Sequence, residues 1–90
     1  MKIGLCVSGY RLCEEDEKDG FYMVEIEDGA VLREGVVHEW ADFDVVISKG
    51  TSPALRARYR ETLFLKGDFS TVEQALRAYF TGRGTFAREV

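Results

Sequence analysis

No run of apolar residues in this sequence approaches the roughly 18 to 20 residues that a helix needs to cross a bilayer. The amino-terminal stretch MKIGLCVSGY is not followed by a cleavage site of the A-x-A kind and is typical of a first strand rather than a targeting signal. We therefore expect a cytoplasmic protein with no membrane partner. Only two cysteines occur, Cys6 and Cys13, and in the cytoplasm they are expected to be reduced thiols rather than a disulfide.

The sequence also lacks a surplus of basic residues. Its 12 Lys and Arg residues are outnumbered by 16 Asp and Glu residues, which gives a formal net charge of −4. A general nucleic-acid-binding domain usually carries the opposite balance, so we expect no nucleic-acid partner. The one dense run of charge, CEEDEKDG over residues 13–20, is acidic and is interpreted as a solvated loop.

The motifs of common enzymes are missing as well. The chain contains no Walker-type phosphate loop, no G-x-S-x-G elbow and no C-x-x-C redox pair. His38 is the sole histidine, and nothing close to it in the sequence would make it the base of a nucleophile. We therefore expect a protein that is not an enzyme.

What the sequence does contain is the composition of one folded domain. Of its 90 residues, 46% are hydrophobic and 31% are charged, which is typical of a folded chain rather than a disordered one. A chain of this length has room for a single core. We expect one domain over residues 1–82, followed by a C-terminal tail over residues 83–90.

Alternating or unbroken apolar residues predict five strands, at residues 2–8, 21–27, 30–37, 44–48 and 62–66. The first and fourth have no polar face, which is typical of central strands that are covered on both sides. Asp28-Gly29 predicts a type I′ hairpin turn between the second and third strands. Gly35 indicates a bulge or a weak edge in the third strand.

Helix signals follow the fourth and fifth strands. Ser52 is a good N-cap residue, with Pro53 at the first helical position. Residues 70–82 have the i, i+3, i+4 apolar spacing of a helix. Its capping box is formed by Ser70 with Glu73 or by Thr71 with Gln74. The segment HEWADF, residues 38–43, is long enough for a turn or two of helix at most.

This order of elements, β-β-β-(short α)-β-α-β-α, predicts an α/β fold. Three strands joined by loops or hairpins form an antiparallel half, and two strands joined by crossover helices form a parallel half with right-handed connections. The natural arrangement is a five-stranded mixed sheet in the order 3-2-1-4-5, with helices on its faces and the first helix shortened. That is the ribonuclease H-like architecture. Nucleases of this fold hold metal ions with carboxylates that begin on the first strand, and residues 3–7 offer none.

In such a sheet the carboxyl ends of the first and fourth strands flank a switch point, which is where open α/β sheets bind ligands. Two loops converge there, residues 8–13 and 48–52. The helix start behind Ser52 and the charge of Lys49 favour an anion. The candidate cofactor-binding residues are Ser8, Gly9, Cys13, Lys49, Gly50, Thr51 and Ser52. The alternative is a strand-to-helix turn that binds no ligand.

Cys13 and His38 are the candidate metal ligands, because thiolate and imidazole suit iron–sulfur and related clusters. Cys13 lies in a loop near the switch point, whereas Cys6 in a covered strand is interpreted as a small buried hydrophobe. The C-x6-C spacing of the two cysteines is no recognised chelate. A chain without a metal centre is therefore the alternative.

Three segments between Tyr22 and Gly82 carry a family resemblance. They match FYMVEIEDGAV, DFDVVISKGTSPALRARY and FLKGDFSTVEQALRAYFTG. The last of them holds a T-x-E-x-A-L-x-x-Y-x-x-G pattern at Thr71, Glu73, Ala75, Leu76, Tyr79 and Gly82. The chain thus resembles the dinitrogenase iron–molybdenum cofactor biosynthesis family, whose members include NifX-like domains and the domain at the end of NifB proteins.

The resemblance implies a small non-catalytic domain with the ribonuclease H-like fold. It also implies binding or carriage of an iron–sulfur or iron–molybdenum type cluster, with cofactor-assembly or cluster-acceptor proteins as partners. Two family features are missing: a Ser-x-His-Phe-Gly segment, replaced here by LCEEDEKDG, and a longer connection where this chain has HEWADF. The alternative hypothesis is a protein-interaction or regulatory module that keeps the fold and has lost the cluster. A homodimer would then cover the sheet face that the shortened connection leaves open.

Overall fold

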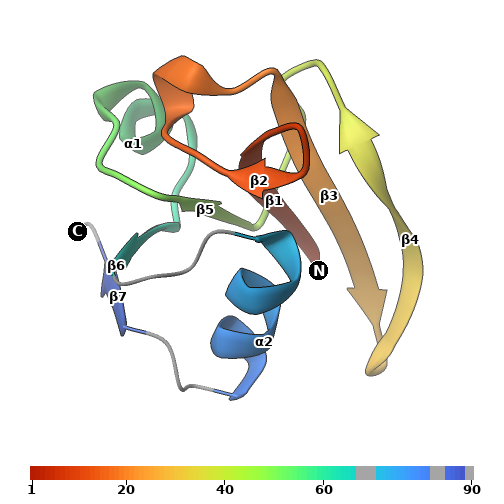
Figure 1. Cartoon of the computed structure of the whole chain (residues 1–90). Coiled ribbons are helices and arrows are strands. Elements are labelled where there is room, and N and C mark those ends of the chain that lie inside the picture. The colour runs from red at the N-terminus through yellow and green to blue at the C-terminus, as the bar shows by residue number, and fades with distance from the viewer. Residues whose placement is uncertain (67–70, 82–84, 89–90) are drawn as a thin grey trace.

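A mixed β-sheet forms the centre of the computed structural model (Figure 1), which describes residues 1–66, 71–81 and 85–88. Within these residues six strands lie side by side in the order β4-β3-β1-β5-β6-β7. Their bounds are β1 (Lys2–Ser8), β3 (Gly20–Glu27), β4 (Ala30–Val37), β5 (Val45–Ser48), β6 (Thr62–Lys66) and β7 (Thr85–Arg88). The short β2 (Arg11–Leu12) pairs with β1 outside this path. β1 is antiparallel to β3 and parallel to β5, so the sheet has the two predicted halves.

The expectation of five strands is wrong in number, although the predicted order of those five is confirmed. β7 adds an edge strand antiparallel to β6, within the residues expected to form a tail. Backbone groups along the outer side of β6 need hydrogen-bond partners, and the four residues of β7 provide them. β2 adds two residues beside the end of β1, too few to produce a hydrophobic period in the sequence.

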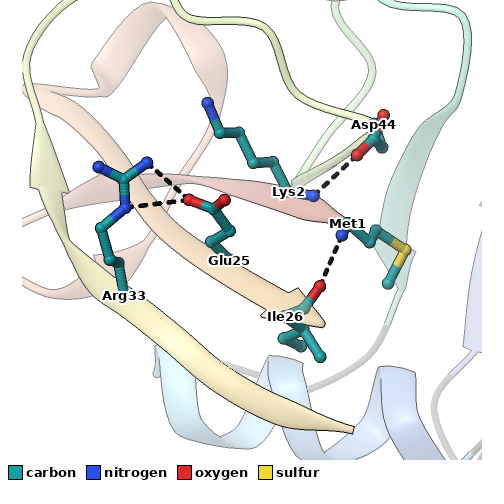
Figure 2. Close-up of polar contacts among 6 residues, drawn as sticks. All are labelled: Met1, Lys2, Glu25, Ile26, Arg33 and Asp44. Carbon is teal, nitrogen blue, oxygen red and sulfur yellow. Dashed lines mark hydrogen bonds and ion pairs between the residues drawn. The ribbon is translucent and has the colours of Figure 1, made fainter. Parts of the chain in front are cut away.

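The β3–β4 hairpin turns at Asp28 and Gly29, whose φ angles of 54° and 78° have the sign that the predicted turn requires. Gly35 was expected to mark a bulge or a weak edge, and β4 is an edge strand of the sheet. The bulge itself lies elsewhere, because the register between the strands shifts directly after Glu25. Arg33 stays opposite Glu25, and its guanidinium donates hydrogen bonds of 2.6 Å and 3.0 Å to the carboxylate (Figure 2). These bonds lower the pKa of Glu25.

The two α-helices in the described residues are α1 (Pro53–Arg58) and α2 (Val72–Thr81), and a short 3-10 helix, η1, spans Glu15–Glu17. Ser52 Oγ accepts a hydrogen bond from Leu55 N over 3.2 Å, which confirms it as the N-cap of α1. Thr71 and Gln74 form the capping box of α2, with bonds of 3.2 Å and 3.4 Å; the alternative box at Ser70 lies outside the described residues. No helix in these parts of the chain is long and apolar enough to cross a membrane.

The helices cover opposite faces of the sheet, which we call the α1 face and the α2 face (Figure 1). The buried core of the α2 face consists of Ile3, Leu5, Val7, Leu12, Val45, Ile47, Leu63, Val72 and Ala75. The buried core of the α1 face consists of Cys6, Phe21, Phe43, Val46, Leu55 and Tyr59. Adjacent residues of β1 enter different cores because side chains alternate along a strand. This alternation explains why β1 and β5 have no polar face.

The connection between β4 and β5 contains no helix, contrary to the expectation of a turn or two over residues 38–43. Its aromatic side chains pack on the α1 face instead: the rings of Trp40 and Phe43 lie 5.4 Å and 5.1 Å from that of Phe21. A segment this short gains few helical hydrogen bonds after nucleation. Ring burial against the sheet is therefore the more favourable use of these residues.

The start of β1 is hydrogen-bonded to segments on both of its sides (Figure 2). The Met1 amino group donates to Ile26 O over 2.6 Å, and Ile26 N donates to Met1 O over 2.8 Å. On the other side, Lys2 N donates to the Asp44 carboxylate and Asp44 N donates to Lys2 O, both over 2.8 Å. The start of β1 is thus held by backbone hydrogen bonds on both of its sides.

Candidate functional site

The two loops predicted to form a site meet where the parallel strands β1 and β5 end. The chain turns back after β1 at Gly9 and Tyr10, which have φ angles of 56° and 65°. Cys13 N then donates to Cys6 O over 3.0 Å, and Lys49 N donates to Cys13 O over 3.2 Å. The backbone of Cys13 therefore joins the two loops.

Contacts within the protein explain the residues of the turn that follows β1. Ser8 and Gly9 are exposed, and Gly9 N donates to the Asp19 carboxylate over 3.2 Å. The positive φ of Gly9 explains why a glycine stands there, since the space beside its Cα is open and nothing approaches it closely. A ligand is not needed to explain either residue.

The expected cradle at Gly50 holds a carboxylate of the chain itself. A Cβ at this position would lie 2.9 Å from Glu14 Oε1, so the close approach that glycine permits is used by Glu14. Ser48 Oγ donates to Gly50 O over 2.9 Å and holds the loop in this conformation. A carboxylate in this place repels an anionic ligand. Sequence reasoning missed Glu14 because nothing in the acidic run indicates which carboxylate lies against Gly50.

The remaining predicted residues of the second loop have different surroundings. Lys49 and Thr51 are exposed, whereas Ser52 is buried and its hydroxyl caps α1. The cap satisfies a backbone donor that would otherwise be orphaned at the helix start. Ser52 is therefore a structural residue of α1 in this geometry.

Both cysteines are free thiols that contribute to the core of the α1 face. Burial, and then the neighbouring Cys13, raise the pKa of Cys6 to about 12. Burial, and then the carboxylates of Glu17 and Asp19, raise the pKa of Cys13 to about 11. These surroundings favour the protonated form of both thiols, and a metal ion bound there would have to displace the proton.

His38 is not brought into a set of metal ligands. Its Nδ1 lies 3.1 Å from Asp19 O, and its side chain lines a cavity of about 220 Å³. Among the described residues, one group of potential ligands lies close together and consists of Glu14, Asp16 and Glu17. The ligand atoms of these three carboxylates lie within 4.8 Å of one another. The group includes neither His38 nor Cys13, and its exposed carboxylates are of a kind that is common without a metal.

A groove that sequence reasoning missed lies on the α2 face. It has a volume of about 470 Å³ and its walls come from the start of α2, the β1–β2 turn, β3 and β4. We call it the α2 groove, and its lining residues are Tyr10, Tyr22, Glu34, Thr71, Val72, Glu73 and Leu76. The sequence held one signal of the groove, because Tyr10 is a large aromatic residue in a tight turn, where small and polar residues are usual. In the structure its side chain is 66% exposed.

Tyr10 and Tyr22 form one end of the α2 groove. Their ring centroids are 6.2 Å apart and the rings are inclined by 63°. Tyr22 OH donates to Glu34 Oε2 over 3.1 Å, and burial, followed by this bond, raises the pKa of Tyr22. The phenol therefore stays protonated and holds the carboxylate beside the ring pair. The second carboxylate of the groove, Glu73, is paired with Arg77 over 3.0 Å.

No family model matches the chain, and no curated protein matches it by sequence. A crystal structure of a "putative dinitrogenase" from Methanocaldococcus jannaschii is similar, with a TM-score of 0.76. The alignment covers 97% of this chain and 94% of the other, at 15% sequence identity. The two proteins share a fold. At 15% identity this likeness extends to the fold alone.

Proposed function

We propose that this chain is a small non-catalytic protein-interaction module that keeps a dinitrogenase-like fold and binds a partner protein through the α2 groove. The observation that carries the proposal is the groove itself, a concave and mainly apolar surface with an exposed aromatic residue, Tyr10, at its edge. Exposed apolar concavities of this kind commonly mark interaction sites. The corner between β1 and β5 supports the same view, because its glycines and its helix cap already serve internal contacts.

Panning a random peptide library against the chain tests this function. We expect peptides that lose about tenfold in affinity, or about 1.4 kcal/mol, when Tyr10→Ala removes the exposed ring from the groove. Leu32→Ala is the matched control, because Leu32 is 53% exposed on β4 but does not line the groove. Selected peptides that bind both variants as well as the original chain would contradict the proposal. Peptides that lose affinity only to Leu32→Ala would move the site away from the groove.

A cluster carrier is the second candidate function. It is favoured by the fold shared with the archaeal protein and by the junction of the Cys13 and Lys49 loops. Anaerobic reconstitution with iron and sulfide separates the two candidates. An interaction module takes up no more iron than its Cys13→Ala variant does. Visible charge-transfer absorption that is lost in Cys13→Ala would instead support the carrier.

A further inference from the structure

The charged residues that line the α2 groove are all acidic. Its apolar walls are the side chains of Val72 and Leu76 together with the two tyrosine rings, and the charged residues among its lining are Glu34 and Glu73. No Lys or Arg is among the lining residues that the structure describes. A ligand that fills the groove must therefore present apolar surface along its length and positive charge at its end.

The two carboxylates differ in what already neutralises them. Glu73 has a cationic partner in Arg77, one helical turn away. Glu34 is hydrogen-bonded to the neutral Tyr22 hydroxyl, and the ion pairs found among the described residues do not include it. The Glu34 carboxylate thus lies at the aromatic end of the groove without a cationic partner among the described residues, and a cation would be attracted to it there.

The tyrosine pair adds a second attraction for a cation. Aromatic ring faces carry negative potential, and an ammonium or guanidinium group is stabilised when it lies over one. The inclination of 63° between the rings of Tyr10 and Tyr22 leaves them as two walls of a corner rather than a closed stack. Tyr10 remains 66% exposed, so its ring is available to a ligand.

We propose that the α2 groove binds a protruding Lys or Arg side chain of a partner protein, with the aliphatic stem along Val72 and Leu76 and the cationic group between Tyr10, Tyr22 and Glu34. Long basic side chains combine these two properties, an apolar stem and a charged end. This inference rests on the proposed function and specifies the anchor residue that the partner must supply. It also agrees with the net charge of −4 of the chain, which favours a basic partner over an acidic one.

Fluorescence anisotropy with defined peptides tests the anchor. The probes are labelled peptides of Leu and Ala that differ at one central residue, which is Lys, Arg, norleucine or Glu. Norleucine keeps the stem of Lys and removes its charge. The Lys and Arg peptides should bind the unmodified chain at least about tenfold more tightly than the norleucine peptide, and the Glu peptide more weakly still.

Two variants assign the effect to the groove. Glu34→Gln should remove most of the preference for Lys over norleucine, and Tyr10→Leu should weaken it while keeping the apolar wall. Glu27→Gln is the matched control, because this exposed carboxylate at the end of β3 does not line the groove. Equal loss of the preference in Glu27→Gln would mean that net charge alone is responsible and would overturn the anchor.

The failure of this inference can be distinguished from the failure of the proposed function. If the norleucine peptide binds as well as the Lys peptide, the basic anchor is wrong and the interaction module stands. If none of these peptides binds while panning yields groove-dependent peptides, the conclusion is the same. If both experiments yield no binding at the groove, both proposals fall. If free butylamine binds as tightly as the Lys peptide, the occupant is a small amine, which overturns the assignment to a partner protein.

Discussion

The two faces of the sheet are covered by different means. On the α1 face, a six-residue helix is supplemented by the loop between β4 and β5, whose Trp40 stacks on Tyr59 at 6.0 Å with an inclination of 9°. On the α2 face, α2 packs on β1, β5 and β6, and the parts of β3 and β4 that lie beside it contribute to an open groove. β4 itself follows the outer edge of the molecule (Figure 1).

The difference shows that a missing helix need not leave a sheet face open. Aromatic side chains from an irregular loop fill the space on the α1 face, because each ring buries a large apolar area from a single backbone position. The groove remains on the other face, where the β1–β2 turn places the ring of Tyr10 at the end of the groove and leaves the groove open.

Removing the ring of Phe43 should make the α1 face as open as the α2 face. Phe43 is 8% exposed and packs against Phe21 and Tyr59. We expect Phe43→Ala to lower the free energy of unfolding by about 3–5 kcal/mol, through lost burial and the cavity left behind. Urea denaturation measures the change, with Val31→Ala at an exposed position of β4 as control. A loss of less than about 1 kcal/mol would mean that the loop does not cover this face.

An added methyl group at residue 4 should destabilise the fold less than removal of the Phe43 ring does. A Cβ at residue 4 would lie 2.7 Å from the ring of Phe43, so we expect Gly4→Ala to destabilise the fold by about 1–3 kcal/mol through overpacking. In the Phe43→Ala background the added methyl has room, and the cost of Gly4→Ala should largely disappear. An additive double-mutant cycle would show that Gly4 is needed for another reason.

The helix caps give a paired test of the two faces. Ser52 is 5% exposed, whereas Thr71 is exposed. Removal of a cap costs about 0.5–2 kcal/mol, and a buried orphan donor lies at the upper end of such ranges. We therefore expect Ser52→Ala to cost more than Thr71→Ala in thermal or urea unfolding. The reverse order would indicate that α2, rather than α1, depends on its cap.

The smallest effect on stability is expected in the α2 groove. Tyr10→Leu alters an exposed side chain and should change the free energy of unfolding by no more than about 0.5 kcal/mol, although it weakens binding of a basic anchor. A destabilisation of about 2 kcal/mol in the same urea titration would show that Tyr10 is part of the core and that the groove is not free for a partner.

Much of the fold could be predicted because strong local signals agree with it. The Asp28-Gly29 turn and the Ser52 cap with Pro53 behind it were each specified by a few adjacent residues with known preferences. A capping box was predicted at either Ser70 or Thr71, and the structure has the one at Thr71. The strand order followed from the connections between elements. β7 was missed because four residues at a sheet edge are too few to show a hydrophobic period. The conformation of residues 38–44 was missed because contacts with residues distant in sequence hold their aromatic rings.

The candidate site could be predicted only in outline. That the Cys13 and Lys49 loops meet follows from topology, and the structure brings them together. The entry of Glu14 over Gly50 depends on the path of an acidic loop, which the composition does not define. The α2 groove depends on what lies beside α2 rather than on any motif. Packing contacts between distant segments produce no characteristic spacing of residues in the sequence.

Trp40 also gives the protein a built-in optical reporter. It is the sole tryptophan of the chain, and the ammonium group of Lys18 and the guanidinium of Arg58 lie 4.6 Å and 5.3 Å from its ring. Its emission should respond strongly when the α1 face melts, because the stacked ring and both cations are then lost together. It does not line the α2 groove. Intrinsic fluorescence is therefore a probe of unfolding, and a binding assay for the groove needs its label on the peptide.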